Sequence, residues 1–342
     1  MNKILLIYTG GTIGMMEDHQ TGSLIPFDFE QLRDFVPELR RFKSQIEVVA
    51  FDNPIDSSDV SIETWQNLAR IIEINYTHYD GFVILHGTDT MAYTASALSF
   101  MLQNLSKPVI LTGSQLPIGR LRTDGKENLI TAIEIAAARK NNEAQIQEVA
   151  IYFESQLYRG NRTHKYNTEN FDAFQSANFP ALADVGVHIF YRSDLLLRAE
   201  GEFSIAPQLD GRVAVVKIFP GITESVLRGT LNAHDLKGIV LETFGAGNFP
   251  QKPALHEALR DAIARGIVIV NVSQCNKGFV EQGRYETSYA LQKMGVIGGA
   301  DMTSEAALTK LMHLLGQGHN PAETERLMMT SLRGELTAFS AL

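Results

Sequence analysis

The sequence lacks the features that would place it outside the cell or in a membrane. Its single cysteine, Cys275, excludes an intrachain disulfide and favours a reducing compartment. No apolar run approaches the ~20 residues that a membrane span needs, and the amino terminus carries no signal-peptide pattern. We therefore expect a cytoplasmic protein without a membrane partner.

The chain also lacks an excess of positive charge. It has 30 Lys and Arg against 39 Asp and Glu, which gives a formal net charge of −9. No stretch concentrates basic residues, so binding to a nucleic-acid backbone is disfavoured. Hydrophobic residues make up 44% of the 342 positions, which is typical of a globular protein with a substantial core.

Short apolar runs alternate with stretches of helical periodicity along the chain, and this pattern predicts parallel strands joined by helices. The expected strands are 4–8, 46–51, 81–85, 108–111, 149–153, 213–218, 238–242 and 267–272. The expected helices are 29–39, 62–76, 91–105, 126–140, 224–232, 253–265, 288–293, 304–315 and 321–329. In the second of these helices the apolar spacing predicts one buried face, and Ser61 is a suitable N-cap.

The alternation lapses between residues 192 and 211, which we interpret as a linker with room for a short hairpin. We therefore expect two domains of α/β class. A larger N-terminal, mostly parallel α/β domain covers residues 1–191, and a smaller C-terminal α/β domain covers residues 212–342.

The first predicted strand runs directly into the turn Thr9-Gly-Gly-Thr12. Two adjacent glycines allow a sharp turn and a close approach to the backbone. They leave the Thr12 hydroxyl at the carboxyl end of a strand, where open α/β sheets bind ligands. The spacing does not match a dinucleotide or P-loop motif. A tight turn with no further role is the alternative interpretation, and Thr12 as a nucleophile is our hypothesis.

Two more hydroxyl-rich turns follow early strands. Thr88 and Asp89 come after the strand 81–85, and Asp56-Ser57-Ser58-Asp59 comes after the strand 46–51. Either set is also suited to capping the helix that follows it. Together the three turns predict a polar pocket with few charges, which favours a small zwitterion over a nucleotide.

A threonine hydroxyl needs a neighbouring base before it can act as a nucleophile. His86 is interpreted as a packed, hydrogen-bonded residue, and no histidine pair has the spacing of metal ligands. We therefore predict no metal site. Lys165 is the candidate base or proton relay beside Thr88 and Asp89, although spacing alone equally allows a surface lysine.

These segments resemble the signature motifs of bacterial-type L-asparaginases, in the type I, cytoplasmic branch. The matching stretches are Thr9-Gly-Gly-Thr-Ile-Gly-Met15 and His86-Gly-Thr-Asp-Thr-Met91. The likeness continues through residues 111–115, 157–163 and 295–302, and so covers essentially the whole chain. It implies an asparaginase-like fold and an enzyme that hydrolyses L-asparagine to L-aspartate and ammonia, without a cofactor, as a homotetramer or homodimer.

The resemblance also implies roles for individual residues. Thr12 attacks the amide carbon, and Thr88, Asp89 and Lys165 move protons and activate the hydrolytic water. Asp89 faces the substrate's α-ammonium group, and Ser57 faces its α-carboxylate, with Asp56 and Ser58 beside it. Backbone N–H groups of the Gly11 and Thr88 turns stabilise the oxyanion.

Some positions depart from the family pattern. The predicted lid, residues 15–29, carries Leu24 where many members have a tyrosine that touches the nucleophile, so Tyr285 is the candidate substitute. Gln274 and Cys275 match part of an effector site that some members have, whereas Glu242 and His164 differ from the residues expected there. For Cys275 the alternative interpretation is a small buried apolar residue.

Three other functions compete with a specific asparaginase. The first is a glutaminase-asparaginase of broader specificity, because one methylene changes selectivity by only ~1–3 kcal/mol. The second is an ammonia-supplying amidotransferase subunit, which normally has an additional N-terminal domain that we do not expect here. The third is an amino-acid sensor, which would not need two threonines and a lysine together.

Overall fold

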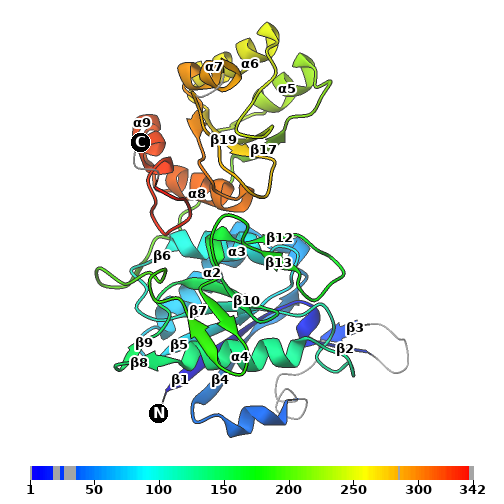
Figure 1. Cartoon of the computed structure of the whole chain (residues 1–342), viewed down its shortest axis with the longest axis vertical. Helices are drawn as coiled ribbons and strands as arrows, with labels where there is room; N and C mark the ends of the chain where they lie inside the picture. Colours follow the sequence, from blue (N-terminus) through cyan, green and yellow to red (C-terminus); the bar gives the residue numbers. More distant parts are fainter. Residues whose placement is uncertain (1, 18–23, 27–35, 284–285, 339–342) are drawn as a thin grey trace. The chain divides into compact units, whose positions relative to one another are not determined.

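The protein is described by a computed structural model that covers residues 2–17, 24–26, 36–283 and 286–338. The chain divides into two compact units, Met1–Pro207 and Gln208–Leu342 (Figure 1). Each unit contains its own sheet and its own apolar core. Among the described residues no helix is long and apolar enough to cross a membrane.

The first unit is built on an eight-stranded sheet with the order β15-β14-β11-β10-β7-β5-β1-β4. The five strands from β10 to β4 are parallel, and β11, β14 and β15 are added antiparallel. Their bounds are β1 Lys3–Gly10, β4 Gln45–Ile55, β5 Gly81–Leu85, β7 Val109–Thr112, β10 Val149–Phe153, β11 Gln156–Arg159, β14 Ala183–Val185 and β15 Ile189–Tyr191. The parallel strands therefore end at one common edge.

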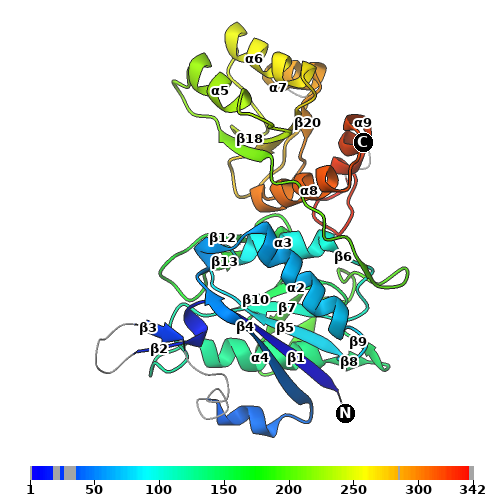
Figure 2. The same cartoon turned by 180° about the vertical axis from the view of Figure 1, so that it is seen from behind.

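Helices cover both faces of this sheet. Helix α4 (Gly125–Ala137) lies on one face, and α2 (Ile62–Asn75) and α3 (Met91–Met101) lie on the other (Figures 1 and 2). Because β1, β5, β7 and β10 are enclosed in this way, they are buried on both sides, as their unbroken apolar runs predict. Helix α2 begins with the predicted Ser61 cap and buries Trp65, Leu68, Ala69 and Ile72.

Short elements that the sequence did not predict are added to this frame. Helix α3 ends at Met101 and is followed by β6 (Leu102–Gln103), and α4 is followed by the hairpin of β8 (Arg139–Lys140) and β9 (Glu143–Ala144). Another antiparallel pair joins β12 (His164–Lys165) to β13 (Phe174–Gln175).

Two predictions fall partly outside the described residues. The helix expected at 29–39 is described only from residue 36, where Pro37–Arg41 forms a 3-10 helix. The expected lid is described at β2 (Met15–Glu17) and β3 (Leu24–Pro26), which pair antiparallel. The remainder of residues 15–29 lies outside the described residues.

The short hairpin predicted between residues 192 and 211 is wrong. The strand there is β16 (Ser204–Ile205), and it pairs with β6, about a hundred residues earlier in the chain. Such a partner is distant in sequence, so the local turn pattern did not indicate it.

The second unit has a four-stranded parallel sheet with the order β17-β18-β19-β20. One apolar cluster packs α5, α6 and α7 against it, and a second cluster packs α8 and α9. The bounds are β17 Val213–Lys217, α5 Glu224–Leu231, β18 Gly238–Thr243, α6 Pro253–Ala264, β19 Val268–Ser273, α7 Glu286–Met294, β20 Ile297–Gly298, α8 Ser304–Gly316 and α9 Pro321–Met328.

A buried ion pair ties the end of the described chain to α8. The Nζ atom of Lys310 lies 2.5 Å from Oε1 of Glu335, and both side chains are completely buried. The ammonium also donates to the carbonyls of Met328 and Thr330, and Glu335 accepts from the main-chain amides of Leu332 and Arg333. Burial lowers the pKa of Lys310 in spite of the neighbouring carboxylate.

Candidate active site

The turns that follow β1 and β5 touch at the carboxyl edge of the first sheet. Gly11 has a φ of +85°, and a Cβ added to it would lie 2.4 Å from the amide nitrogen of Gly87. Only glycine fits there, because an L side chain would be both strained and in collision with backbone. The two glycines therefore bring the residues that follow them, Thr12 and Thr88, to neighbouring positions.

The turn that follows β4 completes this arrangement. A Cβ on Gly87 would lie 2.5 Å from the Oγ atom of Ser57, and the hydroxyl of Thr90 donates to the Ser57 carbonyl over 2.6 Å. The carboxylate of Asp56 accepts from the amide and hydroxyl of Ser58, each at 2.8 Å, and these bonds lower the pKa of Asp56. Asp56 thus caps the short 3-10 helix Ser57–Asp59, whereas α2, the helix weighed from the sequence, is capped by Ser61.

Lys165 reaches the turn after β5 from β12. Its Nζ atom donates to Oγ1 of Thr88 over 2.8 Å and to Oδ1 of Asp89 over 2.6 Å. The lysine side chain is 12% exposed, whereas Asp89 is 65% exposed. One cation is therefore held beside one hydroxyl, and the carboxylate next to it stays open to solvent.

Gln115 is a contact of this group that the sequence interpretation did not single out. Thr88 Oγ1 donates to its Oε1 over 3.2 Å, so the Thr88 hydroxyl accepts from Lys165 and donates to Gln115. The turn that carries Gln115 follows β7 and is fixed by Asp124, whose carboxylate accepts from the amides of Gln115 and Leu116. Its position after Gly113 at another strand end was the signal available in the sequence.

Thr12 is the first residue of the short 3-10 helix Thr12–Gly14 at the end of β1. It is half-buried, and none of the residues described in the structure hydrogen-bonds to its hydroxyl. The helix behind it is held by Tyr8, whose hydroxyl donates to the Gly14 carbonyl over 3.0 Å. Thr12 therefore keeps its side chain available at the edge where the other turns meet.

His86 is packed and hydrogen-bonded, as the sequence predicts. It is 1% exposed, with Nδ1 2.7 Å from the Gly87 carbonyl and Nε2 2.9 Å from Oγ1 of Thr94, which accepts from the indole of Trp65. This network assigns a neutral ring that donates to Gly87. Burial lowers the pKa of His86 to about 4.

The lowered pKa of His86 predicts a loss of stability in mild acid. Below the unfolded pKa of about 6.5, the unfolded chain binds a proton that the folded chain refuses until pH ~4. The free energy of unfolding should therefore fall by about 2 kcal/mol between pH 7.5 and pH 5 through this group. Urea unfolding of the wild type and of His86→Gln at both pH values measures this contribution.

Between pH 7.5 and pH 5, the free energy of unfolding of His86→Gln should fall by about 2 kcal/mol less than that of the wild type. His78→Gln, at an exposed histidine, serves as the matched control and should behave as the wild type does. An equal loss in all three proteins would contradict the assignment.

The remaining predicted residues lie in the second unit or outside the described residues. Tyr285 lies outside the described residues. Gln274 donates through Nε2 to the carbonyls of Ile218 and Glu242, so its amide links two strand ends of the second unit. The buried interpretation of Cys275 is wrong, because its side chain is exposed just beyond the end of β19.

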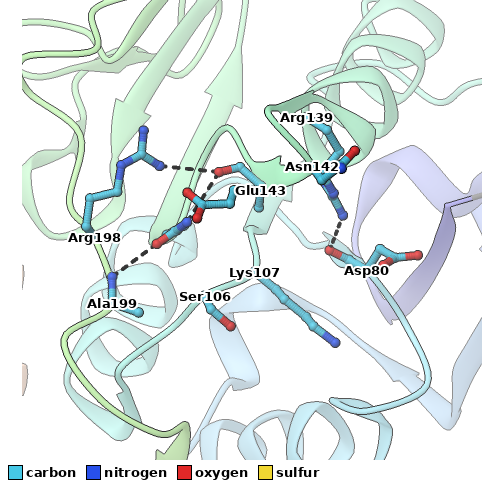
Figure 3. A pocket seen from close by; sticks show the side chains of 10 residues that line it. Asp80, Ser106, Lys107, Arg139, Asn142, Glu143, Arg198 and Ala199 are labelled. Atoms are coloured by element: carbon cyan, nitrogen blue, oxygen red, sulfur yellow. Dashed lines mark hydrogen bonds between the residues drawn. The ribbon is translucent and has the colours of Figure 1, made fainter.

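A cavity of about 580 Å³ lies at the opposite, amino-terminal edge of the first sheet (Figure 3). Two of its cations serve helix ends. Lys107 donates to the carbonyls of Tyr76 and Tyr79 after α2, and Arg139 donates to those of Ala136 and Ala138 at the end of α4. None of the predicted site residues lines it. No group of His, Cys, Asp and Glu among the described residues could hold a metal ion.

The fold and this edge define a hydrolase built of two α/β units. The family description "Asparaginase, N-terminal" matches residues 3–196, and "Glutaminase/Asparaginase C-terminal domain" matches residues 212–328. The chain belongs to the asparaginase family.

Individual relatives agree with this assignment. The chain is 46% identical to L-asparaginase 1 of Escherichia coli (strain K12) over 337 residues, which cover 98% of each protein. It superposes on the crystal structure of L-asparaginase I from Vibrio cholerae with a TM-score of 0.89 and 43% identity, covering 98% of this chain and 99% of that one. It is also 34% identical to one of the subunits of the glutamyl-tRNA(Gln) amidotransferase of Pyrococcus abyssi, covering 99% of this chain and 77% of that protein.

Proposed function

We propose that the chain hydrolyses the side-chain amide of L-asparagine in two steps that share one nucleophile. The Thr12 hydroxyl attacks the amide carbon, its proton passes to the leaving nitrogen, and ammonia departs from a β-aspartyl ester. Water then attacks the ester, which releases L-aspartate and restores the hydroxyl. Backbone amides of the Gly11 and Thr88 turns are positioned near the tetrahedral oxyanion in this scheme.

The observation that carries the proposal is the position of the Lys165 ammonium. The ammonium hydrogen-bonds to both Thr88 and Asp89. These two residues belong to the turn after β5, which touches the turn that carries Thr12. A lysine so placed holds the Thr88 hydroxyl in one orientation and supplies a charge for proton transfer. An amino-acid sensor would gain nothing from this arrangement, since binding does not require proton transfer.

The substrate's α-substituents have partners of the appropriate charge and polarity. The exposed carboxylate of Asp89 suits the α-ammonium group, and Ser57, flanked by Asp56 and Ser58, suits the α-carboxylate. Tyr285 is proposed as an accessory residue at the nucleophile, and Gln274 and Cys275 as effector contacts. We further propose domains at 1–191 and 212–342, a cytoplasmic location, and assembly as a homotetramer or homodimer.

Ammonia release from L-asparagine, L-glutamine and D-asparagine, measured over a concentration series, tests the proposed reaction. We expect the highest kcat/KM for L-asparagine, with L-glutamine reduced by ~10–200-fold because of its extra methylene. Comparable values for the two L-amides would indicate a glutaminase-asparaginase. Release that requires an aminoacylated tRNA as the acceptor of the ammonia would indicate the amidotransferase function, which the similarity to the Pyrococcus abyssi protein favours as the second candidate.

A further inference from the structure

The segment that delivers Lys165 contains little regular structure of its own. Strand β12 is two residues long, and its partner β13 is also two residues long. Yet the Lys165 ammonium lies within 2.8 Å of both Thr88 and Asp89, more than seventy residues away in the chain. Something outside this short ladder must fix the path of the backbone that carries Lys165.

A buried arginine anchors the start of this segment. Arg159 ends β11 and is 4% exposed. Its Nε lies 2.6 Å from Oε2 of Glu148, and its Nη2 donates to the Leu195 carbonyl over 2.6 Å. The other oxygen of Glu148 accepts from the Leu197 amide over 2.9 Å. The guanidinium is therefore fixed between Glu148, next to the sheet, and the segment that contains Leu195 and Leu197.

Phe179 joins this arginine to a second one. The guanidinium carbon of Arg159 lies 4.5 Å from the centroid of the Phe179 ring, and that of Arg162 lies 5.0 Å from it. Arg162 is 3% exposed, so both cations contact the ring away from water. Cation–π attraction is strongest when the cation is desolvated in this way.

The contacts of Phe179 close the base of the β12–β13 hairpin. Arg162 precedes β12, and Phe179 follows β13. Their contact therefore joins the segment that enters the hairpin to the segment that leaves it. The backbone between the two arginines packs closely on α3, since a Cβ on Gly160 would lie 3.0 Å from the Cβ of Ala95. Just after Arg162, the Thr163 hydroxyl donates to the Arg159 carbonyl over 2.7 Å. The backbone therefore has little freedom up to the residue before β12.

We propose that Phe179, held between Arg159 and Arg162, is a positioning residue that sets the Lys165 ammonium against Thr88. The inference rests on the proposed function, because it assigns Lys165 a part in the reaction. Without the aromatic ring, the base of the hairpin opens and the ammonium loses its fixed position, while the substrate contacts of Ser57 and Asp89 stay in place.

Phe179→Leu tests this role, since it keeps an apolar side chain and removes the ring. We expect kcat to fall by ~10–100-fold, since a displacement of about 1 Å can cost up to ~100-fold, with KM changed by less than ~3-fold. Phe179→Tyr keeps the ring and should restore kcat to within ~3-fold of the wild type. Phe190→Leu, at an exposed phenylalanine of the same unit, is the matched control and should leave kcat unchanged.

A double-mutant cycle with Lys165→Met separates positioning from general loss of structure. In the Lys165→Met background, Phe179→Leu should change the residual kcat by no more than ~2-fold, because the group it positions is gone. Thermal unfolding verifies that each variant is folded, and Phe179→Met replaces Phe179→Leu if the latter does not fold.

Two results would overturn the inference. One is a wild-type kcat in the folded Phe179→Leu or Phe179→Met variant. The other is an equal fold-loss in the presence and absence of Lys165. A wild-type kcat in Lys165→Met alone would instead refute the proposed function, so the two failures are distinguishable.

Discussion

Thr12→Ala is expected to lower kcat for ammonia release by at least ~10⁴-fold, since loss of a nucleophile in comparable acyl-transfer enzymes costs up to ~10⁶-fold. The Thr12 hydroxyl is the group that forms the ester in the proposed reaction, and the remaining turns are assigned binding, proton transfer and oxyanion contacts. The fold should be retained, because no described residue hydrogen-bonds to this hydroxyl. We expect the free energy of unfolding to stay within ~0.5 kcal/mol of the wild type.

The matched control at this position is Thr12→Ser, which keeps the hydroxyl and should retain measurable turnover. Steady-state kinetics gives the rate, and mass spectrometry of enzyme quenched during turnover should find an aspartyl adduct on the peptide that contains Thr12. Undiminished activity in Thr12→Ala, or an adduct on another peptide, would refute the assignment.

Lys165→Met is expected to have the second-largest effect, a decrease of ~10²–10⁴-fold in kcat, which is the usual contribution of a general acid or base. Methionine is similar to lysine in length, but its side chain carries no charge and no proton that it can donate. The variant therefore removes the hydrogen bonds to Thr88 Oγ1 and Asp89 Oδ1 with little change in packing. Steady-state kinetics with L-asparagine measures the effect.

Lys140→Met provides the matched comparison, because Lys140 is an exposed lysine in β8, whose neighbours Arg139 and Asn142 line the cavity at the opposite edge of the sheet. It should keep the wild-type kcat. A Lys165→Met variant as active as Lys140→Met would refute the proposed function, because it rests on the Lys165 ammonium beside Thr88 and Asp89.

The buried frame of the first unit could be predicted because its strands are enclosed on both faces. Enclosure requires unbroken apolar runs, and the predicted run at 81–85 coincides with β5. The antiparallel additions could not be predicted in this way. Strands such as β12 and β14 are only two or three residues long, too short for an alternating apolar pattern to identify them. The β8–β9 hairpin carries a local signal in its turn, where Asn141 and Asn142 both adopt positive φ.

For the site, the sequence identified which turns carry hydroxyl groups, but not how closely the turns approach. That Gly11 faces Gly87, rather than only a ligand, follows from the register of β1 on β5. Gln115 was not singled out because its side chain is one of many polar residues after strands. The burial of Cys275 was predicted wrongly because cysteine is usually a buried residue type.

The buried pair of Lys310 and Glu335 determines how far this chain can be shortened. Truncation before Glu335 would leave the lysine ammonium in an apolar interior without its carboxylate, and uncompensated buried charges of this kind cost ~3–5 kcal/mol. That is a large part of the roughly 5–15 kcal/mol by which a typical domain is stable. An affinity tag or fusion partner placed after Thr337 leaves the pair intact. Glu335 is therefore the residue that a shortened version of the chain has to retain.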